Sequence, residues 1–413
     1  MSPQDRREFL FSTAGGLAAC ALTPSLALAR PIIRAGAPVQ VALIGAGRQG
    51  RAILGELATI PECAVVAVCD SDDSRLQAAL RRAQGVKGFA SHAELLEKAP
   101  EVEALVIATP THLHTQIALA AIAAGKHVFL ETPLAHTLDD LSAISEAARR
   151  STKTVAAGFQ GRANPVYSLA RSFFKAGALR ELASLRSQNN KKTSWRTPGS
   201  TPERDRELNW HLDPAHSLGL IGEMGAHQFD VYSWFLARQP VAARARGELR
   251  LHKDGREIPD TVACELVYDD GLVLDWSCTL ANSYEGRYEL FNGAMAAIKL
   301  AWTHGWMFKE ADAPTAGWEV YANRQQFHND SGITLIADAT KLASQGKLQE
   351  GVGLPYTSLY YSLADFVKCV AEKAAPACSI SDAARTTAVA IKAHEALRTR
   401  SEVAIDPKLL EAL

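Results

Sequence analysis

The stretch from residue 39 to 50, VQVALIGAGRQG, constrains the fold more than any other part of the chain. An apolar run gives way to Gly45, Gly47 and Gly50, and a helical pattern follows. In a dinucleotide-binding turn the first glycine permits the tight turn, the second lets the backbone approach a pyrophosphate, and the third lets the helix pack on the strand. A glycine-rich turn between strand and helix also occurs without a nucleotide. The stretch therefore predicts strand, turn and helix, and raises the question of a nucleotide.

Length and composition indicate a soluble globular protein. The 413 residues favour two domains, and the net charge of -1 gives no reason to expect a nucleic-acid partner. No uninterrupted apolar run approaches the roughly 20 residues that span a bilayer, so we expect no stable membrane insertion. The seven cysteines lack the short paired spacings of zinc or dithiol sites.

The N-terminus reads as a targeting segment. Arg6 and Arg7 precede a mildly apolar, Gly/Ala-rich run that ends at Ala29, which is typical of a twin-arginine signal over residues 1–29. A lipoprotein cleavage site at Cys20 and an ordinary basic N-terminus are the alternatives. The twin-arginine route carries folded proteins, so it suits a periplasmic protein that leaves the cytoplasm with its cofactor already bound.

Strands and helices alternate from about residue 37 to 159. This pattern predicts a Rossmann domain over 36–158, with a doubly wound parallel sheet and ligands at the carboxyl ends of its strands. The expected strands after the first are 64–69, 103–108, 127–130 and 155–159, and the expected helices are 51–60, 74–82, 90–99 and 116–124.

Asp70 lies twenty residues past Gly50, at the end of the second expected strand. A carboxylate there can accept hydrogen bonds from both hydroxyls of an adenosine ribose, and it repels a 2'-phosphate. This favours NAD over NADP. The alternative is that Asp70 caps the helix that begins near Asp72.

The remainder predicts a different architecture. Residues 159–355 contain a helix over 164–174 and a series of alternating apolar and polar runs, which predict an α+β domain with a mostly antiparallel sheet. One face of this sheet should pack on helices and the other should be free for subunit contact, which favours a homo-oligomer. Two helices, 356–371 and 381–398, fall in a C-terminal part, 356–413, that we expect to pack on both domains. The runs expected as strands are 181–187, 242–250, 261–268, 272–280, 287–292 and 296–300, whereas 302–353 shows no regular pattern.

Two polar segments of the second domain contain groups that suit a sugar. Residues 188–198 and 207–213 combine amides and cations for hydroxyls with an indole face for a pyranose ring. A solvated surface loop is the ordinary alternative. The candidate substrate residues are Lys191, Trp195, Arg196 and His211.

A further candidate group lies on a helix that should begin near Gly222. Glu223, His227 and Asp230 are spaced four and three residues apart and so share one helix face. His227 is the candidate acid/base, with a histidine satisfied by core hydrogen bonds as the alternative. The carboxylates could orient the imidazole or bind sugar hydroxyls. A metal is not expected, because no further ligand cluster accompanies these three residues.

Three motifs in order carry a family resemblance. The runs GAGRQG, IATPTHLHTQIALAAIAAGKHVFLETPLA and GEMGAHQFD resemble the glucose-fructose oxidoreductase, inositol dehydrogenase and rhizopine catabolism family, written Gfo/Idh/MocA. The resemblance covers nearly all of the chain after the signal. It implies NAD as the cofactor and a carbohydrate substrate, with His227 facing the nicotinamide as acid/base; the predicted export in a folded state fits a tightly bound NAD. The residues implied to contact the cofactor are Gly45, Ala46, Gly47, Arg48, Gln49, Gly50, Asp70, Thr109, Pro110, His114, Glu131 and Gln160.

The chain departs from the family at one position that matters. The usual loop is Glu-Lys-Pro, with a lysine that assists proton movement, whereas this chain has Thr132 between Glu131 and Pro133. Threonine can hydrogen-bond but cannot act as the base. The first hypothesis is an NAD-dependent oxidoreductase that transfers hydride at a ring carbon of a sugar, polyol or glycoside. The alternatives are an NAD-dependent glycosidase, which oxidises transiently and eliminates, and a sugar-binding relative without catalysis.

Overall fold

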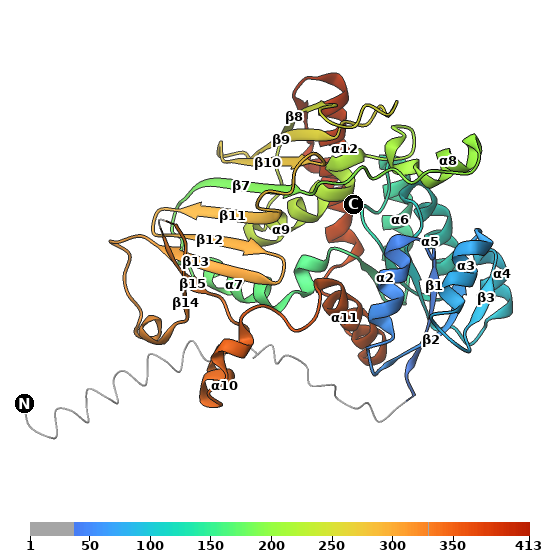
Figure 1. Ribbon diagram of the computed structural model, residues 1–413, viewed down its shortest axis with the longest axis horizontal. Helices are drawn as coiled ribbons and strands as arrows, with labels where there is room; N and C mark the ends of the chain where they lie inside the picture. Colours follow the sequence, from blue (N-terminus) through green and yellow to red (C-terminus); the bar gives the residue numbers. More distant parts are fainter. Residues whose placement is uncertain (1–36, 329) are drawn as a thin grey trace, which may run out of the picture. The chain divides into compact units, whose positions relative to one another are not determined.

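The computed structural model describes residues 37–413 except 329. The predicted signal with Arg6, Arg7, Cys20 and Ala29 lies outside the described residues. The remainder contains two sheets, one near each end of the view in Figure 1.

The first sheet has six parallel strands in the order β3-β2-β1-β4-β5-β6. The strand order reverses between β1 and β4, which is where doubly wound sheets bind ligands. The predicted Rossmann architecture is confirmed. Its elements are β1 (Val39–Ile44), α2 (Arg48–Leu57), β2 (Cys63–Cys69), α3 (Asp73–Leu80), β3 (Lys87–Phe89), α4 (His92–Lys98), β4 (Ala104–Ile107), η1 (Thr111–Leu113), α5 (His114–Ala123), β5 (His127–Leu130), α6 (Leu138–Arg150) and β6 (Val155–Ala157).

The central strand β1 is buried on both faces. Val41 and Leu43 pack in one hydrophobic cluster, whereas Ala42 and Ile44 pack in the other. Successive side chains point to opposite faces of a sheet, so a continuous apolar run is what helices on both faces require. This explains why the sequence of β1 shows no polar alternation.

The turn after β1 has no room for a side chain at Gly45 or at Gly50. Gly45 has φ +95°, and a Cβ there would lie 2.6 Å from the carbonyl oxygen of Ala108. A Cβ on Gly50 would lie 1.8 Å from the carbonyl oxygen of Gly45. Helix α2 therefore crosses the strand end at backbone contact distance, as the motif predicts.

The second sheet has ten strands in the order β14-β15-β13-β12-β11-β7-β10-β9-β8-β16. Only β7 and β10 pair in parallel, so the predicted mostly antiparallel sheet is confirmed. Its strands are β7 (Leu182–Asn190), β8 (Ala242–Glu248), β9 (Thr261–Val267), β10 (Val273–Thr279), β11 (Arg287–Gly293), β12 (Ala296–Ala301), β13 (His304–Lys309), β14 (Arg324–Gln326), β15 (Ser331–Thr334) and β16 (Val403–Ala404).

Two parts of this sheet differ from expectation. Strand β7 continues to Asn190, past the predicted end at 187, because Gln188 to Asn190 pair with β10 and β11. The tract 302–353, which shows no pattern, contributes β13, β15 and β14 at one end of the sheet, with β14 as the edge strand. Edge strands need no alternation, and the three residues of β14 are all exposed.

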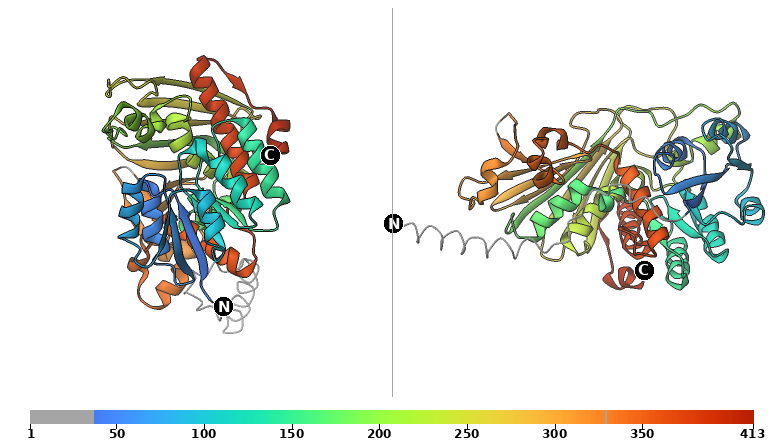
Figure 2. Two further views of the ribbon diagram at one scale, coloured as in Figure 1. Left: turned by 90° about the vertical axis from the view of Figure 1, so that its right-hand side faces the viewer. Right: turned by 90° about the horizontal axis from the view of Figure 1, so that it is seen from below.

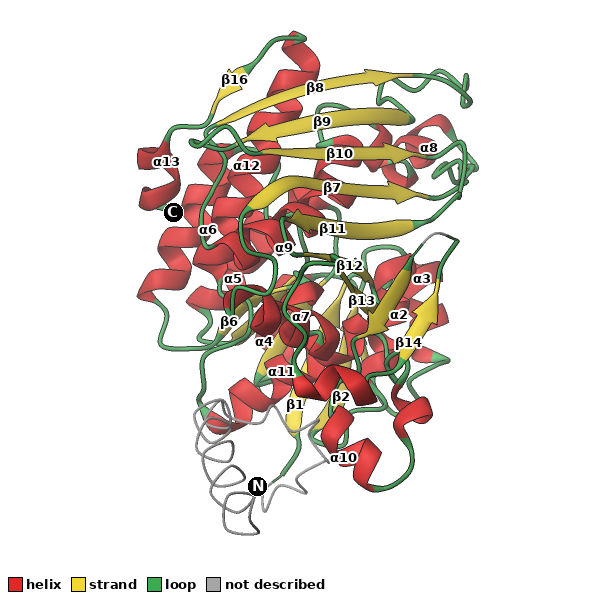
Figure 3. Ribbon diagram, turned by 90° about the vertical axis from the view of Figure 1, so that its left-hand side faces the viewer, coloured by secondary structure: helices red, strands yellow, loops and turns green. Residues whose placement is uncertain are grey.

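Helices cover one face of the second sheet, as Figure 3 shows. Helix α9 (Ala226–Leu236) is bonded to it: the Tyr232 hydroxyl donates to the Arg186 carbonyl at 2.7 Å, and Gln228 donates to the Tyr288 carbonyl at 2.9 Å. Helix α12 (Ile380–Thr399) contacts β8 and α9 on this side and α6 on the other, and α11 (Ser358–Glu372) contacts β1 and α2. The remaining helical segments are η2 (Gln160–Ala163), α7 (Pro165–Lys175), α8 (Pro202–Leu208), η3 (Trp210–Leu212), η4 (Ile221–Gly225), η5 (Gly317–Tyr321), α10 (Ala339–Ser344), η6 (Leu348–Gly351) and α13 (Pro407–Ala412).

The glycine crossing generates a stability prediction. Gly50→Ala should destabilise the protein by about 1–3 kcal/mol or more, because the new Cβ overlaps the Gly45 carbonyl. Gly55→Ala is the matched control in the same helix, where nothing lies within 4 Å of the added Cβ. It should stabilise by about 0.5–1 kcal/mol. Urea unfolding measures both variants, and equal midpoints would contradict the argument.

Candidate cofactor and catalytic site

The glycine turn leaves a helix N-terminus that fits a pyrophosphate. No side chain caps α2 at Gly47, and a Cβ there would meet only the Arg75 guanidinium, at 4.0 Å. Arg48 and Gln49 in the first turn are exposed. The first N–H groups of a helix lack intrahelical partners and carry partial positive charge, so they bind anions. The predicted cradle is therefore sterically open at Gly47 and closed at Gly45 and Gly50.

Asp70 is held rigidly beside this turn. Its Oδ2 accepts from the Ala46 N–H at 2.7 Å and its Oδ1 accepts from the Asp72 N–H at 2.8 Å. Each oxygen keeps acceptor capacity for a ribose hydroxyl. The residue that caps α3 is Asp72, which accepts from the Arg75 N–H at 3.0 Å, so Asp70 is not the cap. The Ala46 N–H is used within the protein and is not available to a phosphate.

The ends of β4 and β5 carry hydroxyls without partners. Among the described residues, Thr109 Oγ1 and Thr132 Oγ1 are buried and make no hydrogen bond. Buried polar groups are nearly always satisfied, so such orphans mark places where a ligand supplies the partner. Both lie in loops at the carboxyl edge of the sheet, as the sequence predicts. Their position fits a nicotinamide amide or a substrate hydroxyl.

His114 shapes these two loops. Its Nε2 lies 3.0 Å from the Thr109 carbonyl oxygen, and its Nδ1 lies 3.2 Å from that of Pro133 and 3.3 Å from that of Leu134. Burial lowers its pKa to about 4. Both ring nitrogens face main-chain carbonyls, so the structure makes His114 a link between the loops and not an open contact for the nicotinamide.

Glu131 and Gln49 connect the β5 loop to the glycine turn. Gln49 Nε2 donates to Glu131 Oε1 at 3.0 Å, and Glu131 is 7% exposed. Burial raises the pKa of Glu131 to about 7, against the lowering effect of the Gln49 bond. Gln160, at the start of η2, is also buried. The predicted cofactor residues of β1, β5 and β6 thus lie along one edge of the sheet, although Gln160 shows no partner among the described residues.

Glu223 comes from the second part of the chain and meets the first. It lies in the π-helical turn η4, a geometry that is frequent at functional sites. Thr111 Oγ1 donates to Glu223 Oε1 at 3.3 Å. Burial raises the pKa of Glu223 to about 8, and the charge of Glu131 acts in the same direction. The buried carboxyl of Glu131 in the first domain therefore raises the pKa of the partly buried Glu223 in the second.

His227 begins helix α9 directly after this turn. Its ring meets Phe159 edge-on, with centroids 5.5 Å apart, and it has no hydrogen-bond partner within the described part of the chain. Burial, with the positive charge of Arg287, lowers its pKa to about 3. The alternative of a histidine satisfied by core hydrogen bonds is therefore not what the structure contains. The imidazole is neutral and its nitrogens are free for a ligand.

Asp230 has a different environment from the one predicted. Arg162 binds both its oxygens at 2.9–3.1 Å, Thr386 donates to it at 3.2 Å, and it is 1% exposed. It makes no bond to His227. The expectation that it orients the imidazole or binds sugar hydroxyls is corrected: its acceptor capacity is used in a buried ion pair between α9 and η2.

The four candidate substrate residues lie in the segment that follows β7. Trp195 is only 8% exposed, so its indole is not an open platform for a sugar. Arg196 pairs with Asp205 at 2.6 Å, and His211 Nε2 lies 2.9 Å from the Trp195 carbonyl oxygen. Lys191 is exposed. Most of these side chains therefore make contacts within their own segment.

Sequence reasoning missed a ring cluster beside Thr111. His112 lies 4.5 Å from the His216 ring and 5.9 Å from the Trp210 ring, between centroids, and its Nδ1 is buried without a partner. Burial lowers the pKa of His112 to about 4. The signal was present in the run THLH, where His112 directly follows Thr111, but its partners come from a distant segment.

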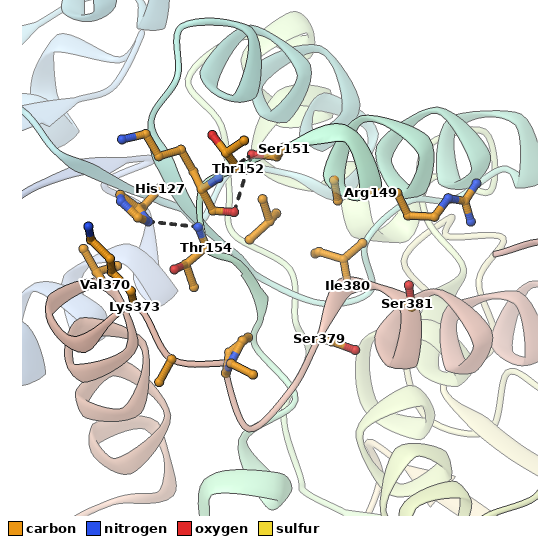
Figure 4. A pocket seen from close by; sticks show the side chains of 16 residues that line it. His127, Arg149, Ser151, Thr152, Thr154, Val370, Lys373, Ser379, Ile380 and Ser381 are labelled. Atoms are coloured by element: carbon orange, nitrogen blue, oxygen red, sulfur yellow. Dashed lines mark hydrogen bonds between the residues drawn. The ribbon is translucent and has the colours of Figure 1, made fainter.

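A separate cavity of about 580 Å³ lies elsewhere (Figure 4). Its lining includes His127 and Val155, the first residues of β5 and β6, together with Lys373. None of the predicted site residues lines it. It therefore opens at the amino ends of strands whose carboxyl ends bear the candidate site.

The described residues contain neither a cluster of metal ligands nor a helix that could span a membrane. No group of three or more His, Cys, Asp or Glu side chains there is arranged to hold a metal ion. No helix of residues 37–413 combines the length and apolarity needed to cross a membrane.

Comparison with known proteins identifies the class and then the family. A family model described as "Oxidoreductase family, NAD-binding Rossmann fold" matches residues 39–159, so the first domain is an NAD-binding Rossmann domain. A second, described as "GFO/IDH/MocA C-terminal domain", matches residues 167–296. The chain belongs to the Gfo/Idh/MocA family, as the resemblance implied.

Individual proteins of known name share only a modest sequence identity with this chain. Inositol 2-dehydrogenase 2 of Saccharopolyspora erythraea is 28% identical over 266 residues, which cover 63% of this chain and 73% of that protein. A glycosyl hydrolase family 109 protein of Shewanella amazonensis is 29% identical over 282 residues, covering 59% of this chain and 61% of that protein. The solved complex of levoglucosan dehydrogenase with NADH and L-sorbose has a TM-score of 0.72, with 20% identity, over 90% of this chain and 100% of that chain. This last likeness shows a shared fold.

The buried ion pair yields a prediction that separates structure from catalysis. Asp230→Ala should destabilise the protein by about 3–5 kcal/mol, because it leaves Arg162 buried without its main partner. Asp269→Ala, which breaks an exposed pair with Arg238, should cost at most about 1 kcal/mol. Urea denaturation provides the comparison. Similar unfolding midpoints for the two variants would show that the Arg162 pair does not stabilise the fold.

Proposed function

We propose that the chain is an NAD-dependent oxidoreductase that transfers hydride at a ring carbon of a sugar, polyol or glycoside. The observation that carries this is that Glu223 of the second domain accepts a hydrogen bond from Thr111 at the sheet edge that bears the glycine turn, and that burial and the charge of Glu131 raise its pKa. Bound NAD would supply the hydride acceptor. The family and the dehydrogenases within it support the same reaction class.

The proton of the substrate hydroxyl needs an acceptor, and Glu223 fits best. Thr132 has no basic group, and the pKa of His227 near 3 makes it a weak base at neutral pH. The pKa of Glu223, near 8, places it close to working pH. In the oxidation direction the Glu223 carboxylate would take the proton of the substrate hydroxyl. Hydride would leave the carbon that bears this hydroxyl, and that carbon would become a carbonyl. Neutral His227 hydrogen-bonds and orients that hydroxyl.

Other properties of the chain follow as proposals. Asp70 favours NAD over NADP, because its fixed carboxylate accepts from ribose hydroxyls and repels a 2'-phosphate. The predicted twin-arginine signal directs the protein to the periplasm. The face of the second sheet that bears no helix of the described chain is the proposed surface for a homo-oligomer (Figure 3).

A glycosidase is the second candidate. Thr132 replaces the lysine of the usual Glu-Lys-Pro loop, and a relative is named as a glycosyl hydrolase family 109 protein. In that reaction NAD would be reduced and reoxidised within one turnover, with no net redox change. A sugar-binding relative without catalysis is the third.

A substrate panel distinguishes the three proposals. The purified protein should form NADH when it is mixed with NAD and its sugar or polyol, followed by absorbance. Release of aglycone from a glycoside without added NAD would favour the glycosidase instead. A thermal shift with sugars and neither product would favour the binding protein. Asp70→Ala should weaken NAD binding, and unchanged affinity would contradict the ribose role.

The proton assignment predicts a pH dependence. Ionised Glu223 is the base, so oxidation should accelerate as pH rises through about 8. Glu223→Gln should lower kcat by about 10²–10⁴-fold and remove this step. Glu97→Gln, at an exposed glutamate of α4, is the control and should retain both. If His227→Gln removed the step and Glu223→Gln kept it, the base would be His227.

A further inference from the structure

One segment of the second domain contacts two loops of the predicted cofactor site. Residues 191–218, here called the strap, connect the end of β7 to the helical segment before α9 and include α8. Figures 1 and 2 show α8 beside helices of the Rossmann domain. The strap belongs to the second domain by sequence but contacts the first.

The contacts lie at both ends of the candidate site. Arg204 of α8 forms an ion pair with Asp72; burial raises the pKa of Asp70, and the charge of Arg204 partly offsets this rise. At the other end the His216 ring packs on His112, at 4.5 Å between centroids. Between them, burial and the charge of Arg48 in the glycine turn lower the pKa of His211. The strap therefore follows the path from the ribose carboxylate to the nicotinamide loops.

Hydrogen bonds and an ion pair connect distant parts of the strap to one another. The Asn209 side chain accepts from the Thr197 N–H at 2.8 Å and donates to the carbonyls of Thr197 and Asp205, at 2.8 and 2.7 Å. Asp205 also accepts from the Gly199 N–H at 3.1 Å and pairs with Arg196 at 2.6 Å. A segment bonded in this way transmits a constraint at Arg204 to its neighbours.

We infer that the strap retains the dinucleotide and that Arg204 is its positioning residue. The Arg204–Asp72 pair holds the strap against the loop that carries Asp70, so its loss should ease the release of a cofactor bound there. The Arg204 side chain is 29% exposed and that of Asp72 12% exposed, so the pair is accessible to solvent and salt. NAD is then a resident group and not a co-substrate that exchanges freely. This inference rests on the proposed NAD function.

The test measures release of NADH. Protein loaded with NADH is mixed with excess NAD, and the loss of bound NADH fluorescence gives the dissociation rate. Arg204→Gln should raise this rate about two- to tenfold, as expected for one partly exposed ion pair. Arg206→Gln is the matched control, because Arg206 lies on the same helix and pairs only with exposed Glu203, at 3.6 Å. It should leave the rate unchanged.

A second variant separates the ion pair from general damage to the strap. Asp72→Asn removes the charge but keeps a residue that caps α3 well. It should raise the rate as Arg204→Gln does, and the double variant should add nothing further. High salt should accelerate release from the wild type but not from either variant.

The outcomes are distinct. Dissociation from Arg204→Gln at the rate of Arg206→Gln, or additive effects in the double variant, would overturn the strap's role while leaving the proposed function intact. Failure of the wild type to bind NADH at all would overturn both.

Discussion

The backbone contact between Gly50 and the Gly45 carbonyl is the constraint on which the rest of the site depends. It sets how closely α2 crosses β1, and so it places the helix N-terminus over the strand end. Because β1 lies between β2 and β4, the loops that follow those strands are its immediate neighbours. Asp70 and Thr109 therefore lie at the same edge of the sheet because of the strand order, and not because of a contact between the two residues. The ligand site is a consequence of strand order once the crossing is fixed.

Burial alone does not decide the charge of an acid in this structure. Asp230, Glu131 and Glu223 are all enclosed, and burial raises the pKa of each. Asp230 has the Arg162 guanidinium against both oxygens, which stabilises its ionised form. Glu131 and Glu223 have only neutral donors and each other. A carboxyl group is thus structural at one position and has a pKa near neutral pH at the other two.

What the sequence predicts well is what depends on local pattern. The apolar run of β1 and the glycine spacing both rest on neighbouring residues. The errors concern partners far apart in the chain. Asp230 shares a predicted helix face with His227, but Arg162, 68 residues away, decides its role. No sequence pattern indicates the ion pair of Arg204, because its partner Asp72 belongs to another domain.

The threonine at position 132 is consistent with the rest of the site. A lysine there would follow Glu131 directly and add a cation beside the buried carboxyls, lowering their pKa values. Thr132 adds none, and its hydroxyl has no partner among the described residues. Glu131 then keeps the raised pKa that burial gives it, and Glu223 keeps the one that burial and the charge of Glu131 give it. In the proposed reaction Glu223 would then take the place of the missing lysine as the proton acceptor.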